Sequence, residues 1–198
     1  KDIVAGDFYW VKRIRIGEDI WKFAGVADCT GHGVPGAMMS VLCMNALNES
    51  SRLLENADPA DLLTRVSAYL RNYLLTDGME LSDGMDISVA CYNSEKKILR
   101  FCGANNPLWL LNENDIEVIA PTKRPVGKSE SGRPFELHER TYTENQRILL
   151  FSDGCIDQFG EVTGKKLKTK GLRKMVLDQF DSDPKKHLQQ IEQGLFTW

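Results

Sequence analysis

The sequence has too few histidines and too few paired cysteines for a zinc site. Of its 198 residues, three are histidines and five are cysteines, and neither type forms the close pairs that zinc sites use. The cysteines lie singly in apolar stretches, at Cys29, Cys43, Cys91, Cys102 and Cys155. This scatter favours reduced, buried thiols in a reducing compartment. We therefore expect a cytoplasmic location, with tethering to a membrane sensor in a longer parent protein as the alternative.

Long apolar runs and an excess of positive charge are also missing. No run approaches the roughly 20 apolar residues of a membrane span, so direct membrane insertion is not expected. A formal net charge of −3 gives no electrostatic reason to expect nucleic acid as a partner. Hydrophobic residues at 42% and charged residues at 27% are typical of a globular protein. The length and the absence of repeats or linkers predict one domain over residues 1–198.

The residues from Val26 to Ala37 organise the rest of the chain. An apolar run ends at Asp28, a turn with three glycines follows, and Pro35 opens a helical pattern. Glycine allows tight backbone approach, and proline suits the first turn of a helix. The pattern predicts a strand, a turn and a helix, with Asp28 at the strand's end. A carboxylate there can bind a hard cation or simply cap the turn, and this stretch alone leaves both readings open.

Residue periodicity along the chain predicts an α+β fold. Asp58 and Pro59 are typical of a helix start, and the helical repeat that follows continues to Leu74. Two consecutive helices thus interrupt a series of short strands, and two more helices follow, which argues against βαβ alternation and for antiparallel sheets faced by helix pairs. The strands are expected at 9–16, 20–27, 87–91, 98–101, 108–111, 116–119, 135–142 and 147–151, and the other helices from residue 37 and at 171–180 and 184–195.

Several aspartates lie beside a glycine or shortly before one at the ends of these expected strands. Asp7, Asp28 and Asp153 share this setting, and Asp83 and Asp86 lie at the entry to another strand. Oxygen ligands without histidine or cysteine partners select Mg²⁺ or Mn²⁺. A pair of such ions can activate water and polarise a phosphoryl group. For each aspartate taken separately, turn capping explains its position equally well.

Five motifs, taken together, resemble a known family. They are Gly6–Trp10, Val26–Ser40, Asp83–Ile87, Gly103–Trp109 and Leu150–Gly154. In order and spacing they are similar to the stage II sporulation protein E (SpoIIE) family. This family is a bacterial branch of the PPM-type metal-dependent serine/threonine protein phosphatases and includes the RsbU-like regulators. The resemblance covers the chain from Asp2 to about Gly171.

The resemblance implies a four-layer αββα sandwich with a two-ion Mn²⁺ or Mg²⁺ site. Asp28 would bridge both ions, the carbonyl of Cys29 would bind one of them, and Asp153 would bind the other. Asp7 would act at the first ion, directly or through its water. The candidate substrate-contacting or supporting residues are His32, Gly31 and Asp86. For His32, a proton-donor role and a structural role in the turn both remain open.

The resemblance also implies an activity and a setting in a larger protein. The activity would be hydrolysis of phosphoserine or phosphothreonine on a bacterial regulatory protein that resembles an anti-anti-sigma factor. The domain would be the C-terminal output domain of a longer signalling protein with an N-terminal sensor domain. A homodimer is a further hypothesis, because regulatory dimerisation is common in such output domains.

One departure from the family pattern qualifies these expectations. In this family a later strand supplies a further aspartate to the second ion, and no such strand follows residue 195 here. Either the sequence is a truncated form of the domain or this copy is impaired. Losing a ligand weakens cation binding, so we expect a partly filled or empty two-ion site in this form. The alternatives are a catalytically impaired regulatory domain that binds a partner without turnover, and a metal-assisted phosphodiesterase or small-molecule phosphatase.

Overall fold

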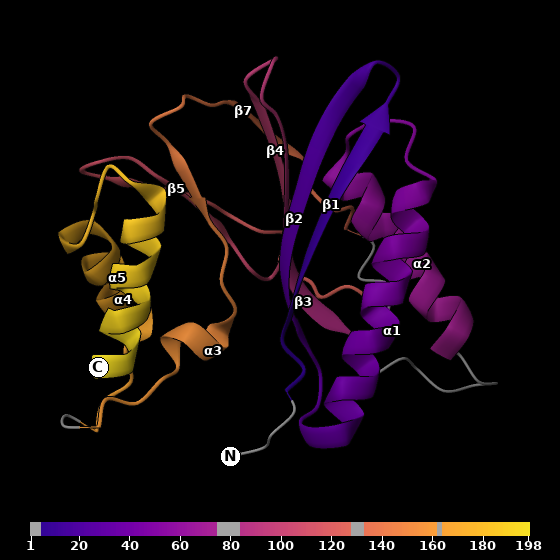
Figure 1. The fold of residues 1–198 in the computed structure, drawn as a ribbon. Helices are drawn as coiled ribbons and strands as arrows, with labels where there is room; N and C mark the ends of the chain where they lie inside the picture. The colour runs from indigo at the N-terminus through magenta and orange to yellow at the C-terminus, as the bar shows by residue number, and fades with distance from the viewer. Residues whose placement is uncertain (1–4, 75–83, 128–132, 162–163) are drawn as a thin grey trace.

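Two antiparallel sheets lie face to face between two pairs of helices in the computed structural model of the chain (Figure 1). The structure describes residues 5–74, 84–127, 133–161 and 164–198. The four layers are, in order, the helix pair α1 and α2, a five-stranded sheet, a three-stranded sheet, and the helix pair α4 and α5. None of the helices within the described residues is long and apolar enough to cross a membrane.

The larger sheet holds the strands that position the candidate site. Its strand order is β1-β2-β3-β4-β7, and every neighbouring pair is antiparallel. Side chains alternate between the two faces, as a strand requires. In β3, Ile87, Val89 and Cys91 pack toward α1 and α2, while Ala90 packs toward the smaller sheet. The bounds are β1 (Phe8–Ile16), β2 (Asp19–Cys29), β3 (Met85–Asn93), β4 (Ile98–Ala104) and β7 (His138–Thr141).

Helices α1 (Gly33–Arg52) and α2 (Pro59–Leu74) cover the outer face of the larger sheet. As predicted, Asp58 caps α2, because its Oδ1 accepts hydrogen bonds from the backbone N–H groups of Ala60 and Asp61 at 2.7 and 3.1 Å. One face of α2 is fully buried through Leu62, Leu63, Val66 and Leu70. Burying that apolar stripe against the sheet is what stabilises the helix.

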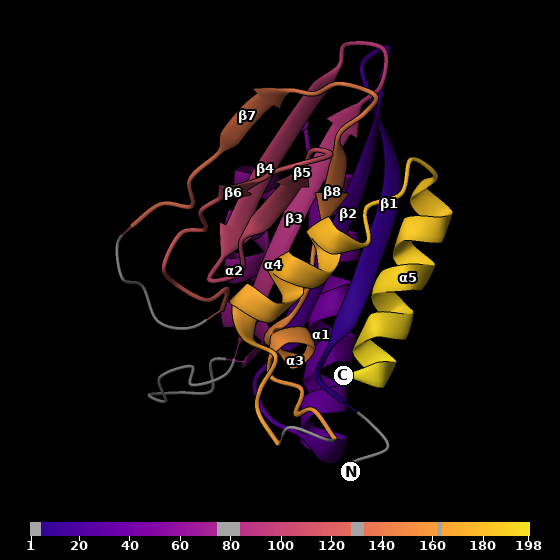
Figure 2. The same cartoon turned by 90° about the vertical axis from the view of Figure 1, so that its left-hand side faces the viewer.

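The smaller sheet has the order β6-β5-β8 and is covered by the second helix pair (Figure 2). Its central strand is buried on both faces: Leu108 and Leu110 pack against the larger sheet, and Trp109 and Leu111 pack against α4 and α5. The bounds are β5 (Leu108–Leu111), β6 (Ile116–Ile119), β8 (Arg147–Leu149), α3 (Asp153–Ile156), α4 (Lys168–Asp178) and α5 (Pro184–Thr197).

The predicted α+β class with antiparallel sheets and flanking helix pairs is confirmed, and the differences concern element ends. The strand expected at 135–142 forms only at β7, and the strand expected at 147–151 ends at Leu149. Asp153 therefore does not directly follow a strand but opens the one-turn helix α3. Helix α4 begins before the predicted Gly171. All five cysteines are free thiols, four of them buried.

Candidate metal centre

A row of four polar residues crosses the larger sheet at one end. Asp28 on β2 lies opposite Asp86 on β3. In the neighbouring strand pairs, Phe8 lies opposite Ala27 and Ile87 lies opposite Ala104. One residue further along, Asp7 comes opposite Asp28 and Asn105 comes opposite Asp86. Residues opposite each other in antiparallel strands share a face of the sheet. The row that we call the transverse row therefore consists of Asp7, Asp28, Asp86 and Asn105, on the face toward the smaller sheet.

Asp153 joins the transverse row from the other side of the sandwich. Ser152, at the N-terminus of α3, donates a hydrogen bond from its hydroxyl to Oδ2 of Asp7 at 2.7 Å. A Cβ added at Gly154 would lie 3.1 Å from the same Oδ2. The charge of Asp153 acts on both Asp28 and Asp86. Segments from opposite ends of the chain thus bring Asp7, Asp28 and Asp153 together.

The electrostatics of these carboxylates are unfavourable without a cation. Burial, hydrogen bonding with Asp7, and the charges of Asp7 and Asp153 together raise the pKa of Asp28 to about 7. Burial also raises the pKa of Asp86, and a hydrogen bond from Asn105 Nδ2, at 2.8 Å, opposes that rise. Carboxylates packed this closely are stabilised by binding either protons or a cation. Their hard oxygen atoms suit Mg²⁺ or Mn²⁺, so this donor set fits the implied ions.

The glycine turn after β2 lies close to the backbone of Cys29 and Gly6. A Cβ at Gly6 would lie 2.7 Å from the carbonyl oxygen of Cys29, so a larger residue would crowd that carbonyl. Gly31 adopts φ +94°, in the region that favours glycine. Thr30 fixes the turn to the start of β3, because its backbone N–H donates to the Gly84 carbonyl at 3.0 Å and its hydroxyl accepts from the Gly84 N–H at 3.0 Å. The carbonyl of Cys29 therefore lies next to Gly6, the residue before Asp7.

The thiol of Cys29 is not a ligand. Its hydrogen bond with Cys43, together with burial, raises its pKa, so it stays protonated. The side chain packs in the cluster beneath α1 and α2, on the face of the sheet away from Asp28. The role of the Cys29 backbone carbonyl as a metal ligand stays a prediction.

The remaining predicted residues fall into three groups. Gly31 lies in the turn, and Asp86 lies in the transverse row. His32 is the exposed residue that precedes α1, and its side chain makes no capping hydrogen bond to that helix. Asp83 lies outside the described residues. The roles of all these side chains in binding stay predictions.

Sequence reasoning missed two polar partners of the carboxylates. Ser152 was only part of a motif, although its place next to Asp153 was a usable signal. Asn105 stands two residues before Pro107 in the sequence, a position that favours a turn role. Its contact with Asp86 depends on the register of β3 and β4, which periodicity does not determine.

The carboxylates form an open ligand set. Among the residues that the structure describes, no group of three or more histidine, cysteine, aspartate or glutamate side chains is arranged to hold a metal ion by itself. The interactions centre on Asp28, and the remaining coordination positions would fall to the Cys29 carbonyl, water and substrate.

The sandwich of two antiparallel sheets with flanking helix pairs is the fold of solved PP2C phosphatase domains. Residues 23–196 match the family model described as stage II sporulation protein E (SpoIIE). The chain therefore belongs to the SpoIIE family, as its motifs predicted. No curated protein gives a significant match to it.

Solved structures support the same assignment. The SiaA-PP2C domain of Pseudomonas aeruginosa is 25% identical at a TM-score of 0.81, over 97% of this chain and 74% of that chain. The RsbU and RsbW domains of Rv1364c from Mycobacterium tuberculosis are 17% identical to this chain with a TM-score of 0.70, over 98% of this chain and 50% of that chain. RsbX in complex with magnesium is 16% identical to this chain with a TM-score of 0.66, over 100% of this chain and 81% of that chain. At these lower identities the last two show the fold alone.

Proposed function

We propose that this chain is a Mn²⁺- or Mg²⁺-dependent serine/threonine protein phosphatase. The observation that carries the proposal is the convergence of Asp7, Asp28 and Asp153 from three separate segments onto one end of the inter-sheet face. Membership of the SpoIIE family supports it. A likeness to a phosphatase domain at 25% identity is consistent with it.

Each group of the proposed site would have its own role in metal binding. Asp7, Asp28, Asp153 and the Cys29 carbonyl would hold the cations, and Ser152 fixes the orientation of Asp7. A bound divalent ion supplies Lewis acidity toward water and toward a phosphoryl oxygen. Asp28 binds a cation best when it is ionised. A bound cation would also offset the repulsion from the two carboxylates that flank it. No side-chain nucleophile is needed.

The substrate in this proposal is a phosphorylated regulatory protein. A phosphoserine on a protein surface can reach carboxylates at a sheet end, since Asp7 and Asp153 are exposed. The resemblance to RsbU-like regulators favours an anti-anti-sigma-factor-like partner. A sensor domain in a longer parent chain and a homodimer belong to the same hypothesis.

The test is hydrolysis of an aryl phosphate and of a phosphoserine protein as a function of Mn²⁺. We expect EDTA to abolish activity and Mn²⁺ to restore it. Asp28→Asn and Asp153→Asn should each lower kcat by at least about 100-fold, because each removes a charged ligand. Asp61→Asn, on the surface of α2 in an ion pair with Arg65, is the matched control and should keep wild-type activity. Unchanged turnover in both site variants would overturn the proposal.

The open ligand set favours one alternative, a regulatory domain that binds a phosphoprotein without turnover. The same assay separates the two functions. A domain of this kind would bind the phosphoserine protein in a pull-down or by calorimetry but show no Mn²⁺-dependent phosphate release. A third reading, a phosphatase of small molecules, predicts faster release from nucleotides than from phosphoserine protein.

A further inference from the structure

The transverse row ends in an amide where a fourth carboxylate would otherwise stand. The row carries Asp7 just before β1, Asp28 on β2 and Asp86 on β3, and past the end of β4 it carries Asn105. Side chains opposite each other in antiparallel strands have Cβ atoms about 4.5–5.5 Å apart. Three carboxylates at this spacing repel one another. The amide at the end adds no charge and supplies a donor.

That donor is used. Asn105 Nδ2 donates to Oδ1 of Asp86 at 2.8 Å, and an acceptor-only carboxylate gains stability from such a bond. The other end of the row has a corresponding donor, because the hydroxyl of Ser152 bonds to Asp7. Each outer carboxylate is therefore held by one neutral donor. The contacts that act on the central residue, Asp28, come instead from Asp7 and Asp153.

The backbone at Asn105 is fixed independently of this side chain. Its φ of +61° lies in the left-handed region, which glycine and asparagine tolerate best. Its N–H donates to the Thr122 carbonyl at 2.9 Å. The hydroxyl of buried Ser88 donates to the carbonyls of Asn106 and Pro107, both at 2.9 Å. Glycine would meet the conformational need of position 105, so the amide can be removed without forcing the backbone to change.

We propose that Asn105 is a positioning residue that acts through Asp86, holding this carboxylate beside Asp28 so that it contributes to binding the divalent cation. The inference rests on the proposed function and extends it. It adds Asp86 to the carboxylates that attract the ion and gives the loop between β4 and β5 a role in cation affinity. The competing explanation is that Asn105 serves only the turn.

Asn105→Gly separates the two explanations. It removes the amide and keeps the left-handed backbone. The readout is the Mn²⁺ concentration that gives half of the maximal rise in Tm, which needs no turnover. We expect this midpoint to increase about tenfold, as when other outer partners of metal ligands are lost. Lys97→Gly, at another residue with positive φ, 54°, in the turn between β3 and β4, is the matched control and should leave the midpoint unchanged.

A double-mutant cycle tests the route through Asp86. Asp86→Asn alone should increase the midpoint by about tenfold or more, and adding Asn105→Gly to it should have no further effect. An Asn105→Gly variant with a lower Tm but a wild-type Mn²⁺ midpoint would overturn the proposal, as would full additivity in the cycle. Asp28→Asn serves as the reference: if it leaves the midpoint unchanged, the proposed function itself fails, whatever Asn105 does.

Discussion

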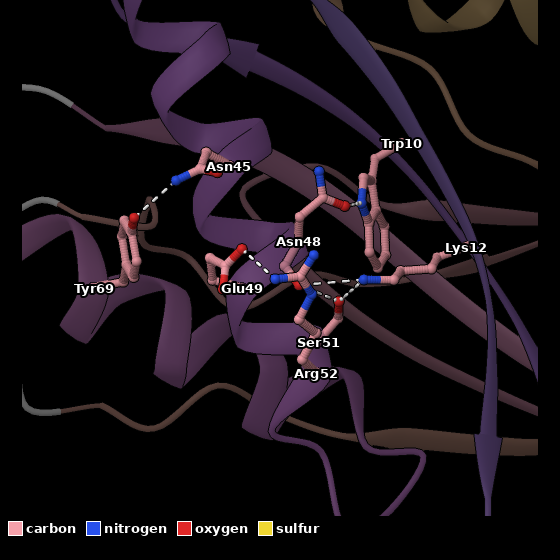
Figure 3. A network of polar contacts seen from close by, with 8 residues as sticks. All are labelled: Trp10, Lys12, Asn45, Asn48, Glu49, Ser51, Arg52 and Tyr69. Atoms are coloured by element: carbon pink, nitrogen blue, oxygen red, sulfur yellow. Dashed lines mark hydrogen bonds and ion pairs between the residues drawn. The ribbon is translucent and has the colours of Figure 1, made fainter.

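Trp10 on β1 donates a hydrogen bond from its indole Nε1 to the side-chain oxygen of Asn48 on α1, at 3.0 Å (Figure 3). Lys12, two residues along the strand, donates to the Asn48 carbonyl at 3.2 Å and to the Ser51 hydroxyl at 2.7 Å. These bonds fix the C-terminal half of α1 to the sheet whose end carries the transverse row. The N-terminus of the same helix follows the glycine turn after Asp28.

We expect Asn48→Ala to destabilise the fold. Trp10 is 4% exposed, so its indole N–H would be left without a partner, at a cost of about 1–3 kcal/mol. Each kcal/mol should lower Tm by about 2–4 °C in a domain of this size. Thermal and urea unfolding measure it. The control is Arg52→Ala, which removes an exposed pair with Glu49 and should cost less than about 0.5 kcal/mol. Equal losses in the two variants would show that the Trp10–Asn48 bond is not a stabilising contact.

The fold class could be predicted from the sequence because its signals are local. The helical repeat after Asp58 and the alternation in β1 and β2 each depend on neighbouring residues, and these elements form at or near their predicted positions. The strand expected at 135–142 is longer than the observed β7, because an apolar residue in the pattern can reflect either a strand or burial outside a strand. Phe135 is buried in the core of the larger sheet without belonging to a strand, and burial alone produces an apolar position.

The candidate site could be predicted only in part, for a related reason. Asp7 and Asp153 each stand beside a glycine, Asp28 stands three residues before one, and this local signal singled them out. Their common location on the inter-sheet face depends on strand register. The same holds for the contact between Asn105 and Asp86. Register is fixed by packing across the whole sheet, so a pattern within one segment does not contain it.

Packing of the second helix pair depends on one buried histidine. His187 on α5 is 2% exposed. Its Nε2 lies 2.9 Å from the Val176 carbonyl on α4, and its Nδ1 lies 2.7 Å from Nη1 of Arg147 on β8. Because a carbonyl only accepts and a guanidinium only donates, Nε2 carries the proton and Nδ1 accepts. The neutral ring thus joins three elements.

We therefore expect His187→Ala to cost about 2–3 kcal/mol, since it leaves a buried carbonyl without a partner and opens a cavity. Guanidinium unfolding measures this loss. Lys186→Ala, an exposed neighbour on the same helix, should change stability by less than about 0.5 kcal/mol. A His187→Ala variant as stable as Lys186→Ala would contradict the assigned network.

Ser152 should affect cation binding more than stability. It stands at the N-terminus of α3, yet its hydroxyl makes no cap bond there and donates to Asp7 instead. Ser152→Ala should therefore increase the Mn²⁺ midpoint and lower kcat/KM by about tenfold each, while the unfolding free energy changes by less than the roughly 1 kcal/mol typical of a lost N-cap. Ser152→Thr keeps the hydroxyl and should restore both values. A loss confined to stability would assign Ser152 to capping.

The metal-free protein should become less stable as the pH rises through the titration of Asp28. Its pKa in the folded state is about 7, against an ordinary value of 3.8 for an aspartate, so the folded state binds this proton more tightly than the unfolded state. The stabilisation is complete below about pH 4 and is lost progressively up to about pH 7. Allowing for solvent screening, the effect should be about 1–2 kcal/mol.

Asp28→Asn removes this titration, and its carboxamide adds no negative charge to the cluster. With EDTA present, we expect the Tm of the wild type to fall between pH 5 and pH 7.5 by several degrees more than that of Asp28→Asn, so that the variant is the more stable protein at pH 7.5. Saturating Mn²⁺ should reverse the order, because only the wild type then gains a cation for its carboxylates. Parallel Tm profiles for the two proteins, with and without Mn²⁺, would mean that the charge of Asp28 is balanced within the protein itself and that the carboxylates do not need an ion.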